Sequence, residues 1–234
     1  MSEATEMAGA TVLVVGGGGR EHAIVWALAK SPSVAQVIVA PGNPGTAAEA
    51  GCRNVAIQAT DISALIALAV AESVDLVVVG PEDPLVLGLV DRLAERKIAA
   101  FGPSAAAAQL EGSKSHCKEF LLRNDIPTGR SRSFTESAGA LAYLAELVVP
   151  PVVKADGLAA GKGVIVAETH HEADVAIREI LDEGRFGDAG AEVLLEERLH
   201  GPEVSVLAFC DGEQFHIMPA ARDHKRLGIG DDGP

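Results

Sequence analysis

The sequence predicts an α/β fold in which an open parallel sheet, covered by helices on both faces, is followed by a smaller α+β part. In the first half of the chain, short apolar runs alternate with helical stretches, as the strand–helix units of a parallel sheet do. Near Gly112 this alternation changes into closely spaced strands around a glycine-rich loop. Apolar residues make up 48% of the 234 residues and aromatic residues 3%, so aliphatic side chains must form the core.

Residues 11–112 are predicted to form the parallel sheet. Apolar runs predict its strands at Thr11–Val15, Gln36–Ala40, Leu76–Val79 and Ile98–Phe101. Helices are predicted at Glu21–Lys30, from Asp61 onward, and at Leu85–Arg96. After Asp61 the apolar residues have the i, i+3, i+4, i+7 spacing of one buried helix face. Because the strands are apolar throughout, helices are expected on both faces of the sheet.

Residues 113–234 are predicted to combine helices with an antiparallel element. Helices are expected at Ser113–Arg123, in a stretch that ends near Leu147, and over the apolar positions from Ala173 to Leu181. Strands are expected shortly after Pro127 and at Val152–Ala155, Val164–Ala167, Glu192–Glu196, Val204–Cys210 and Gln214–Met218. Asp211-Gly212 is predicted to join the last two strands as a hairpin turn, because this dipeptide suits the positive φ angles of tight turns.

The charge balance argues against several classes of partner. The chain has 33 acidic and 19 basic residues, a net charge of −14. Nucleic-acid binding draws most of its affinity from neutralised phosphates, so no nucleic-acid partner is expected, and an anionic membrane surface is disfavoured for the same reason. Solubility by itself accounts for the acidity.

The cysteines and the first residues predict a soluble cytoplasmic protein. Cys52, Cys117 and Cys210 are far apart and show no metal or disulfide spacing, as expected in a reducing compartment. The stretch Met1–Ala10 lacks the layout of a signal peptide and is predicted to be a short disordered tail. No apolar run approaches the roughly 18 residues that a membrane span needs, so no membrane partner is expected.

The first glycine-rich loop, Gly16–Gly19, follows a predicted strand and opens a helix. The backbone N–H groups of such a loop, together with the helix dipole, form an anion site, and Arg20 adds a charged fork suited to phosphate. A dinucleotide fold is disfavoured, because Glu21 stands in place of that motif's third glycine and the second strand ends in Ala40-Pro41 rather than an acidic residue. We expect a phosphate here; a tight turn without a ligand is the alternative.

Glu82 follows an apolar strand within the loop Gly80–Pro84. Ligands of open parallel sheets sit beyond the carboxyl ends of the strands, so Glu82 is expected in the same crevice as Arg20, where its carboxylate suits sugar hydroxyls. An N-cap for the next helix, which Asp83 alone supplies, is the equally weighted alternative. The loop Pro41–Thr46 also follows a strand, but its turn residues need no function.

The second glycine-rich loop runs from Lys154 to Gly163 between two predicted strands. It is not a Walker A loop, because the stretch from Gly157 to Gly161 is one residue too short and Gly163 replaces the Ser or Thr that binds magnesium. A glycine-rich hairpin with Lys154 before it and Lys162 inside it suits a lid over a triphosphate. A plain β-hairpin without a ligand is the alternative.

Two further segments offer groups that suit a ligand. The apolar strand that ends in Glu196–Leu199 presents backbone groups that can pair with an adenine edge, and Glu203 suits ribose hydroxyls. A solvated acidic strand end is the alternative. Asp223-His224-Lys225-Arg226 is a basic cluster suited to carboxylate or phosphate, with a solvated charged face as the alternative.

Together these segments resemble the glycinamide ribonucleotide synthetases, the phosphoribosylamine–glycine ligases of the ATP-grasp superfamily, from about Val12 to Pro234. The resemblance rests on GGGGREH at Gly16, APGNPGTA at Ala40, GPEDPLV at Gly80, FGPS at Phe101, LEGSK at Leu110, VVKADGLAAGKGV at Val152 and DHKR at Asp223. The KADGLAAGKG stretch is the most specific of these motifs. Ile229 departs from the pattern, since the family usually has a polar residue there.

The resemblance implies two domains and three groups of site residues. Residues 11–112 would form a substrate-binding α/β domain, and residues 113–234 an incomplete ATP-grasp domain with a lid subdomain at about 130–200. The implied contacts to phosphoribosylamine are Gly18, Gly19, Arg20, Glu21 and Glu82. The implied ATP contacts are Lys114, Lys154, Gly157, Ala160, Gly161, Lys162, Gly163, Glu196, Glu197, Leu199 and Glu203. The residues implied to position substrates for catalysis are Asp223, Lys225 and Arg226.

The resemblance also implies a reaction in purine biosynthesis. The carboxylate of glycine would attack the γ-phosphate of ATP to give glycyl phosphate, which the amine of 5-phosphoribosylamine captures; positioning and charge neutralisation supply the catalysis. Mg²⁺ or Mn²⁺ would bridge the phosphates, and family members carry the metal ligands beyond the position of Pro234, so no metal ligand is expected in this chain. The complete enzyme is expected to be a monomer and this chain an inactive fragment of it. Another ATP-grasp ligase, or a non-catalytic module that binds a nucleotide or sugar phosphate, is the alternative function.

Overall fold

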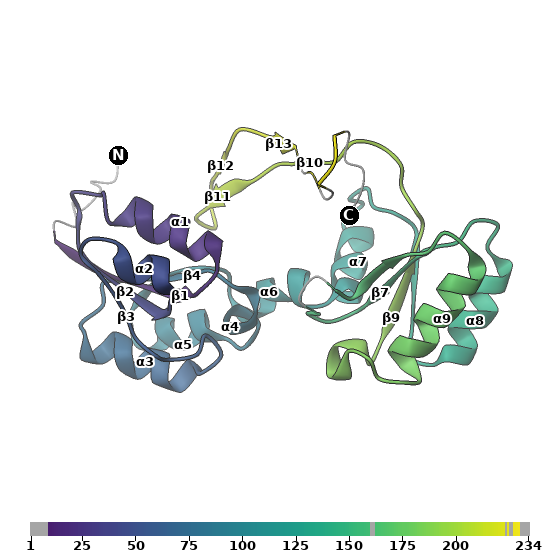
Figure 1. Cartoon of the computed structure of the whole chain (residues 1–234), viewed down its shortest axis with the longest axis horizontal. Coiled ribbons are helices and arrows are strands. Elements are labelled where there is room, and N and C mark those ends of the chain that lie inside the picture. Colours follow the sequence, from purple (N-terminus) through teal and green to yellow (C-terminus); the bar gives the residue numbers. More distant parts are fainter. Residues whose placement is uncertain (1–8, 160–161, 223, 225–226, 230–234) are drawn as a thin grey trace. The chain divides into compact units, whose positions relative to one another are not determined.

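The structure, a computed structural model, describes residues 9–159, 162–222, 224 and 227–229 (Figure 1). It divides into two compact units, Met1–Glu197 and Arg198–Pro234. Of the predicted disordered tail, Gly9 and Ala10 fall within the described residues, and Ala10 begins the first strand.

The first unit opens with a five-stranded parallel sheet in the order β3-β2-β1-β4-β5. Its strands are β1 (Ala10–Gly16), β2 (Val34–Pro41), β3 (Cys52–Asn54), β4 (Leu76–Val79) and β5 (Ala99–Phe101). Val14 of β1 pairs with Val39 of β2 on one side and with Val78 of β4 on the other. The winding direction therefore reverses between β1 and β4, the place where parallel sheets open a crevice for ligands. The predicted open parallel sheet is confirmed.

Helices cover both faces of this sheet, as Figure 1 shows. The helices of this part of the chain are α1 (Gly19–Leu28), α2 (Pro44–Ala48), α3 (Ile62–Ala71), α4 (Glu82–Val86), α5 (Leu89–Glu95) and α6 (Ala105–Gly112). In Figure 1, α1 and α2 lie over one face of the sheet and α3 and α5 over the other. Successive side chains of β1 enter different cores: Leu13 packs in the cluster that holds the buried residues of α3 and α5, whereas Val14 packs in the cluster that holds Val25 of α1. This burial on both faces is the reason why the strands are apolar throughout.

The helix predicted at Leu85–Arg96 is wrong in its extent. The stretch forms two helices, α4 and α5, because Gly88 between them has a φ of 82°, a left-handed conformation that ends a helix and favours glycine. Sequence reasoning also assigned no helix to the alanine-rich stretch that forms α6, where Ser104 provides the N-cap. The start of α3 is confirmed, since Asp61 caps it by accepting the N–H of Ala64 at 3.0 Å.

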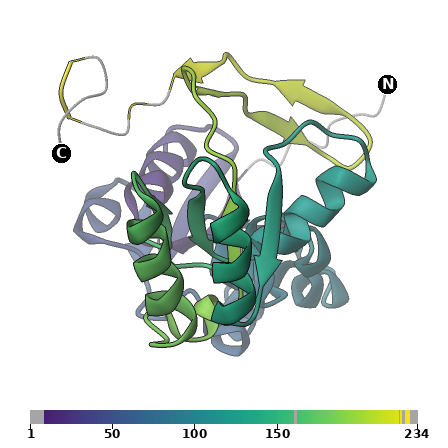
Figure 2. The same ribbon diagram turned by 90° about the vertical axis from the view of Figure 1, so that its right-hand side faces the viewer.

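The second sheet of this unit is antiparallel, in the order β6-β9-β7-β8. Its strands are β6 (Ser131–Phe134), β7 (Val152–Ala155), β8 (Val164–Val166) and β9 (Val193–Glu196). The helices are α7 (Lys114–Arg123), α8 (Ser137–Glu146) and α9 (His170–Leu181), and a 3₁₀ helix spans Gly187–Gly190. Helices α8 and α9 pack against each other and both face the viewer in Figure 2. Ile177 and Ile180 of α9 are buried against Leu195 of β9, which confirms the predicted helix face.

The second unit contains two short antiparallel pairings. Strand β10 (Val204–Ser205) pairs with β13 (Ala221–Arg222), and β11 (Ala208–Cys210) pairs with β12 (Phe215–Ile217). The predicted hairpin turn is confirmed, and Asp211 stabilises it by accepting the N–H groups of Glu213 and Gln214 at 2.9 and 2.7 Å. The single strand predicted at Val204–Cys210 is wrong, because β10 and β11 are separate strands with different partners.

Candidate functional site

The crevice between β1 and β4 brings together the two loops that the sequence analysis placed there. Arg20, at the start of α1, lies with its Nη2 atom 3.5 Å from Oε1 of Glu82, which begins α4. The Arg20 side chain is 59% exposed and that of Glu82 38%, so both are accessible to a ligand. Their adjacency agrees with the predicted crevice, whereas their contacts to a substrate stay a prediction.

Glu21 lies beneath the glycine-rich loop and is only 4% exposed. Its Oε2 atom accepts the N–H of Gly18 at 2.7 Å, and its Oε1 atom lies 3.3 Å from Nε of Arg20 but accepts no hydrogen bond from the described residues. A Cβ atom on Gly16 would come within 2.6 Å of the Glu21 side chain, and one on Gly80 within 2.3 Å. In this structure Glu21 therefore supports the loop from below, and its contact to substrate stays a prediction.

The loop after β2, to which the sequence analysis assigned no function, is tied to the glycine-rich loop. Asn43 donates from Nδ2 to the carbonyl oxygen of Gly17 at 3.0 Å, and its Oδ1 atom caps α2 by accepting the N–H groups of Gly45 and Thr46 at 2.7 and 3.0 Å. Thr46, which is fully buried, donates from Oγ1 to Asn54 Oδ1 at 2.8 Å. These bonds fix one side of the crevice through side chains that are themselves hydrogen-bonded.

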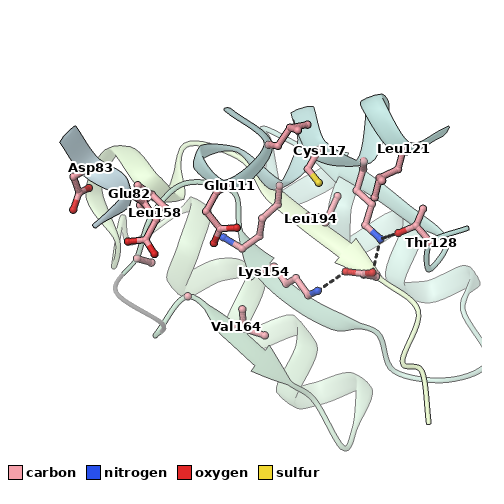
Figure 3. Close-up of a pocket in the computed structure, with 16 residues that line it drawn as sticks. Glu82, Asp83, Glu111, Cys117, Leu121, Thr128, Lys154, Leu158, Val164 and Leu194 are labelled. Carbon is pink, nitrogen blue, oxygen red and sulfur yellow. Dashed lines mark hydrogen bonds and ion pairs between the residues drawn. The ribbon is translucent and has the colours of Figure 1, made fainter. Parts of the chain in front are cut away.

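A second concave region lies between α7, the antiparallel sheet and the ends of α4 and α6, where a cavity of about 740 Å³ is found (Figure 3). Its volume falls within the range of sites that hold a small-molecule ligand. Among its lining residues are three lysines and four acidic residues: Lys114, Lys118, Lys154, Glu82, Asp83, Glu111 and Glu196. The cavity therefore combines a site of ligand size with three lysines, which lie among four carboxylates.

Two of these lysines share one carboxylate. Lys118 donates to Oε1 of Glu196 and Lys154 donates to Oε2, and these bonds are dashed in Figure 3. Burial by itself raises the pKa of Glu196, but the hydrogen bonds from Lys118 and Lys154 outweigh it and hold that pKa below its usual value. Glu196 is therefore an ionised, buried carboxylate between two ammonium groups.

Sequence reasoning missed Lys118, because its partner Glu196 is 78 positions away in the chain. Helix periodicity was the only available signal: Lys118 is four residues after Lys114 on the same helix, so both are expected on one face.

Lys114 is held by the base of the second glycine-rich loop. Its Nζ atom donates to the carbonyl oxygens of Asp156 and Gly157 at 3.2 and 3.1 Å. The carboxylate of Asp156 in turn accepts the N–H of Ser115 at 2.6 Å. The loop and the first turn of α7 are therefore connected by hydrogen bonds in both directions: the loop carbonyls accept from the Lys114 side chain, and the Asp156 side chain accepts from the helix backbone. Burial lowers the pKa of Lys114, although the nearby Asp156 acts in the opposite direction.

The second glycine-rich loop is close-packed where its glycines lie. A Cβ atom on Gly157 would come within 2.8 Å of the Ala189 backbone, and one on Gly163 within 2.7 Å of the Ala159 side chain. Lys162 is exposed, and its N–H bonds to the carbonyl oxygen of Ala159 at 2.9 Å. The loop does join two antiparallel strands, β7 and β8, as predicted. Ala160 and Gly161 lie outside the described residues.

The other predicted site residues are divided between the two units. Glu197 does not line the cavity; its Oε2 atom accepts from Nε of Arg130 at 2.8 Å. Leu199 and Glu203 belong to the second unit and are exposed. The predicted positioning residues Asp223, Lys225 and Arg226 lie outside the described residues.

The part of the chain that the structure describes has neither a cluster of metal-binding side chains nor a helix that could span a membrane. No three His, Cys, Asp or Glu side chains in this part of the chain gather as a metal site would require. None of its helices has the length and apolar character needed to cross a bilayer.

Comparisons with known proteins agree with the resemblance in the motifs. Residues 10–111 match the family model described as phosphoribosylglycinamide synthetase, N domain, and residues 112–234 match the one described as phosphoribosylglycinamide synthetase, ATP-grasp (A) domain. The phosphoribosylamine–glycine ligase of Xanthomonas axonopodis pv. citri is 56% identical over 223 residues, which cover 95% of this chain and 52% of that protein. The ligase of Salmonella typhimurium is 54% identical with the same coverage. The chain thus spans about half the length of the curated relatives it matches.

Solved structures give the same fold. A crystal structure of phosphoribosylamine–glycine ligase from Thermotoga maritima is 31% identical, with a TM-score of 0.76, and the match covers 96% of this chain and 53% of that one. An N5-carboxyaminoimidazole ribonucleotide synthetase in complex with ADP is 24% identical, with a TM-score of 0.70 over 97% of this chain and 56% of that one, and shares the fold. Since family models match residues 10–111 and 112–234 in turn, this chain belongs to the phosphoribosylglycinamide synthetase family.

Proposed function

We propose that this chain forms the sugar-phosphate crevice and the nucleotide-phosphate site of an ATP-dependent ligase that joins glycine to 5-phosphoribosylamine, giving glycinamide ribonucleotide for purine biosynthesis. The observation that carries the proposal is the convergence of Lys114, Lys118 and Lys154 on one cavity beside a glycine-rich loop. Relatives at 56 and 54% identity are named phosphoribosylamine–glycine ligases, and this chain spans 52% of each.

In the nucleotide site, positive charge meets the triphosphate. Lys114 and Lys154 are assigned to contact its oxygens; both residues line the cavity, and Lys154 points into it (Figure 3), which supports the assignment. The loop Gly157–Gly163, with Ala160, Gly161 and Lys162, acts as a lid over the phosphates. The family resemblance assigns the segment Glu196–Leu199 to the adenine and Glu203 to the ribose.

In the crevice of the parallel sheet, Gly18 and Gly19 at the start of α1 are assigned to the phosphate of phosphoribosylamine. The backbone N–H of Gly19 suits this anion directly, whereas that of Gly18 would first have to leave Oε2 of Glu21. The exposed guanidinium of Arg20 suits the same phosphate, and Glu82 suits the ribose hydroxyls. Asp223, Lys225 and Arg226 are assigned to positioning glycine or its phosphorylated form.

The proposed reaction is the one that the family resemblance implies. The glycine carboxylate attacks the γ-phosphate, ADP leaves, and the amine of phosphoribosylamine then displaces phosphate from glycyl phosphate to form the amide. The protein contributes position and charge, and no side chain is needed as a covalent nucleophile. Magnesium, when bound, would offset the negative charge of the phosphates. Its ligands are proposed to lie in the part of the family sequence that follows Pro234, and the complete enzyme is proposed to be a cytoplasmic monomer.

A thermal-shift assay on the 234-residue chain tests the proposal. ATP and ribose 5-phosphate should each raise the Tm in a concentration-dependent way, because a ligand that binds only the folded state stabilises it. NAD should not raise the Tm through the crevice, since Glu21 replaces the third glycine of the dinucleotide motif. A shift with NAD but none with ATP or ribose 5-phosphate would favour a dinucleotide-binding module and overturn the proposal.

A further inference from the structure

The two lysines that share Glu196 are held very differently. The Nζ atom of Lys118 donates to Thr128 Oγ1 at 2.6 Å and to the carbonyl oxygen of Gly129 at 3.0 Å, in addition to Glu196 Oε1. An ammonium group has three N–H donors, so the donors of Lys118 are saturated. Its side chain is only 12% exposed. Lys118 is therefore fixed in place and has no donor left for a ligand.

The ammonium group of Lys154 has N–H donors that remain available to a ligand. Within the described part of the chain its Nζ atom donates to Oε2 of Glu196, and two of its three N–H groups find no other acceptor there. Its side chain is 25% exposed, twice as much as that of Lys118, and it points into the cavity (Figure 3). Lys154 is thus the partner that a phosphate group can draw away from Glu196.

The free-energy cost of moving Lys154 away depends on the charge and burial of Glu196. Its side chain is 11% exposed, and a buried carboxylate that loses its counter-charge is strongly destabilised. If Lys154 were its single partner, a turn of Lys154 toward a phosphate would leave this carboxylate unpaired. With Lys118 bound to the other oxygen, the charge stays compensated. Gly129 supports the arrangement, since a Cβ atom there would come within 2.9 Å of Glu196 Oε1.

We propose that Lys118 is a positioning residue that keeps Glu196 paired, so that Lys154 can turn from Glu196 to the phosphates of a bound nucleotide. This inference rests on the proposed nucleotide site and names a residue of that site that touches no phosphate itself. It predicts that the role of Lys118 depends on the charge of Glu196.

A double-mutant cycle tests that dependence. Isothermal titration would measure ATP and adenosine binding to the 234-residue wild-type chain, Lys118→Met, Glu196→Gln and the double variant. Lys118→Met should weaken ATP binding by about tenfold or more, the scale of a lost hydrogen bond to a charged group, and weaken adenosine binding by a smaller factor, because adenosine has no phosphate for Lys154 to bind. On the Glu196→Gln background, where Lys154 is already released, Lys118→Met should change ATP binding little.

The outcomes separate the inference from the proposed function. If the wild-type chain binds neither ATP nor adenosine, the proposed function fails and the inference falls with it. Two results would overturn the inference alone when ATP does bind. Lys118→Met could lower ATP affinity by the same factor in the wild-type and Glu196→Gln chains, or it could lower adenosine affinity by as much as ATP affinity. A lysine with a merely structural role would give either result.

A ligand-free measurement covers the case in which Lys118→Met does not fold. Acetylation of the wild-type chain and Glu196→Gln, followed by mass spectrometry, would compare Lys118 and Lys154 with the exposed Lys162 as the reference. Glu196→Gln should speed up acetylation of Lys154, while Lys118 stays slow because Thr128 and Gly129 still accept from it. Equal acceleration of both lysines would contradict the asymmetry and overturn the inference.

Discussion

Replacing Gly80 with alanine tests the close fit between the two loops of the sheet crevice. A Cβ atom on Gly80 would lie 2.3, 2.4 and 2.6 Å from Oε1, Cγ and Cδ of Glu21, so the whole side chain must move. Its Oε2 atom would then lose the 2.7 Å hydrogen bond from Gly18. Gly80 has no positive φ angle, so the effect would come from this overlap and not from backbone strain.

The magnitude combines two terms. Overpacking of a close-packed site costs about 1–3 kcal/mol, and a hydrogen bond to a charged group contributes about 1.5–3 kcal/mol. Since the displaced carboxylate regains some solvation, we expect Gly80→Ala to lower the free energy of unfolding by about 2–4 kcal/mol. At about 2–4 °C per kcal/mol, the Tm should fall by roughly 4–16 °C.

Thermal unfolding followed by circular dichroism measures this effect, with Gly19→Ala as the matched control. Gly19 lies in the same crevice at the start of α1, and a Cβ atom there meets nothing within 4 Å, so its Tm should stay the same or rise slightly. In a chain that already carries Glu21→Ala, Gly80→Ala should lower the free energy of unfolding much less than in wild type, because the new Cβ atom can occupy the space of the missing Glu21 side chain. A Gly80→Ala chain as stable as Gly19→Ala would refute the reasoning.

Three further predictions concern the second glycine-rich loop, Glu196 and turnover. Asp156→Ala should lower the free energy of unfolding by about 1 kcal/mol, the usual value of a lost helix cap, because the Ser115 N–H loses its acceptor; urea denaturation measures this. The pKa of Glu196 is lowered on folding, so its ionised form stabilises the chain above the unfolded pKa of about 4.3, and that stabilisation disappears as the pH falls through the folded value. Urea titrations at a series of pH values should therefore show wild type losing its advantage over Glu196→Gln in acid, and a constant difference would contradict this sign. The 234-residue chain with glycine, phosphoribosylamine and Mg-ATP should release no phosphate above background, and glycine-dependent ADP formation at an enzymatic rate would contradict that expectation.

Much of the fold follows from local patterns in the sequence. The strand Leu76–Val79 was predicted with its observed bounds, because four consecutive apolar residues suit a strand buried on both faces. The break at Gly88 was missed, since a glycine within an amphipathic stretch does not reveal whether it adopts the left-handed conformation that ends a helix. The short strand β3, Cys52–Asn54, carries no apolar run and is a strand through its pairing with β2.

Those parts of the candidate site that belong to a recognisable sequence motif were predicted from the sequence. Lys154 and the glycine-rich loop were predicted in this way and line one cavity, and the adjacency of Arg20 and Glu82 agrees with the rule for parallel strands. The hydrogen bonds of Lys118 to Glu196 and of Asn43 to Gly17 span 78 and 26 positions of the chain, and no local pattern encodes them. Such residues become visible only when the fold places their partners beside them.

The central claim, that the cavity between α7 and the antiparallel sheet binds the phosphates of ATP, is tested most directly by titrating ATP into wild type and Lys154→Ala in a calorimeter. Lys30→Ala serves as the control for charge, because Lys30 does not line the cavity. Lys154→Ala should weaken ATP binding by about 1.5–3 kcal/mol, the value of a hydrogen bond to a charged group, while Lys30→Ala leaves it unchanged. Equal ATP affinity of wild type and Lys154→Ala would contradict the account.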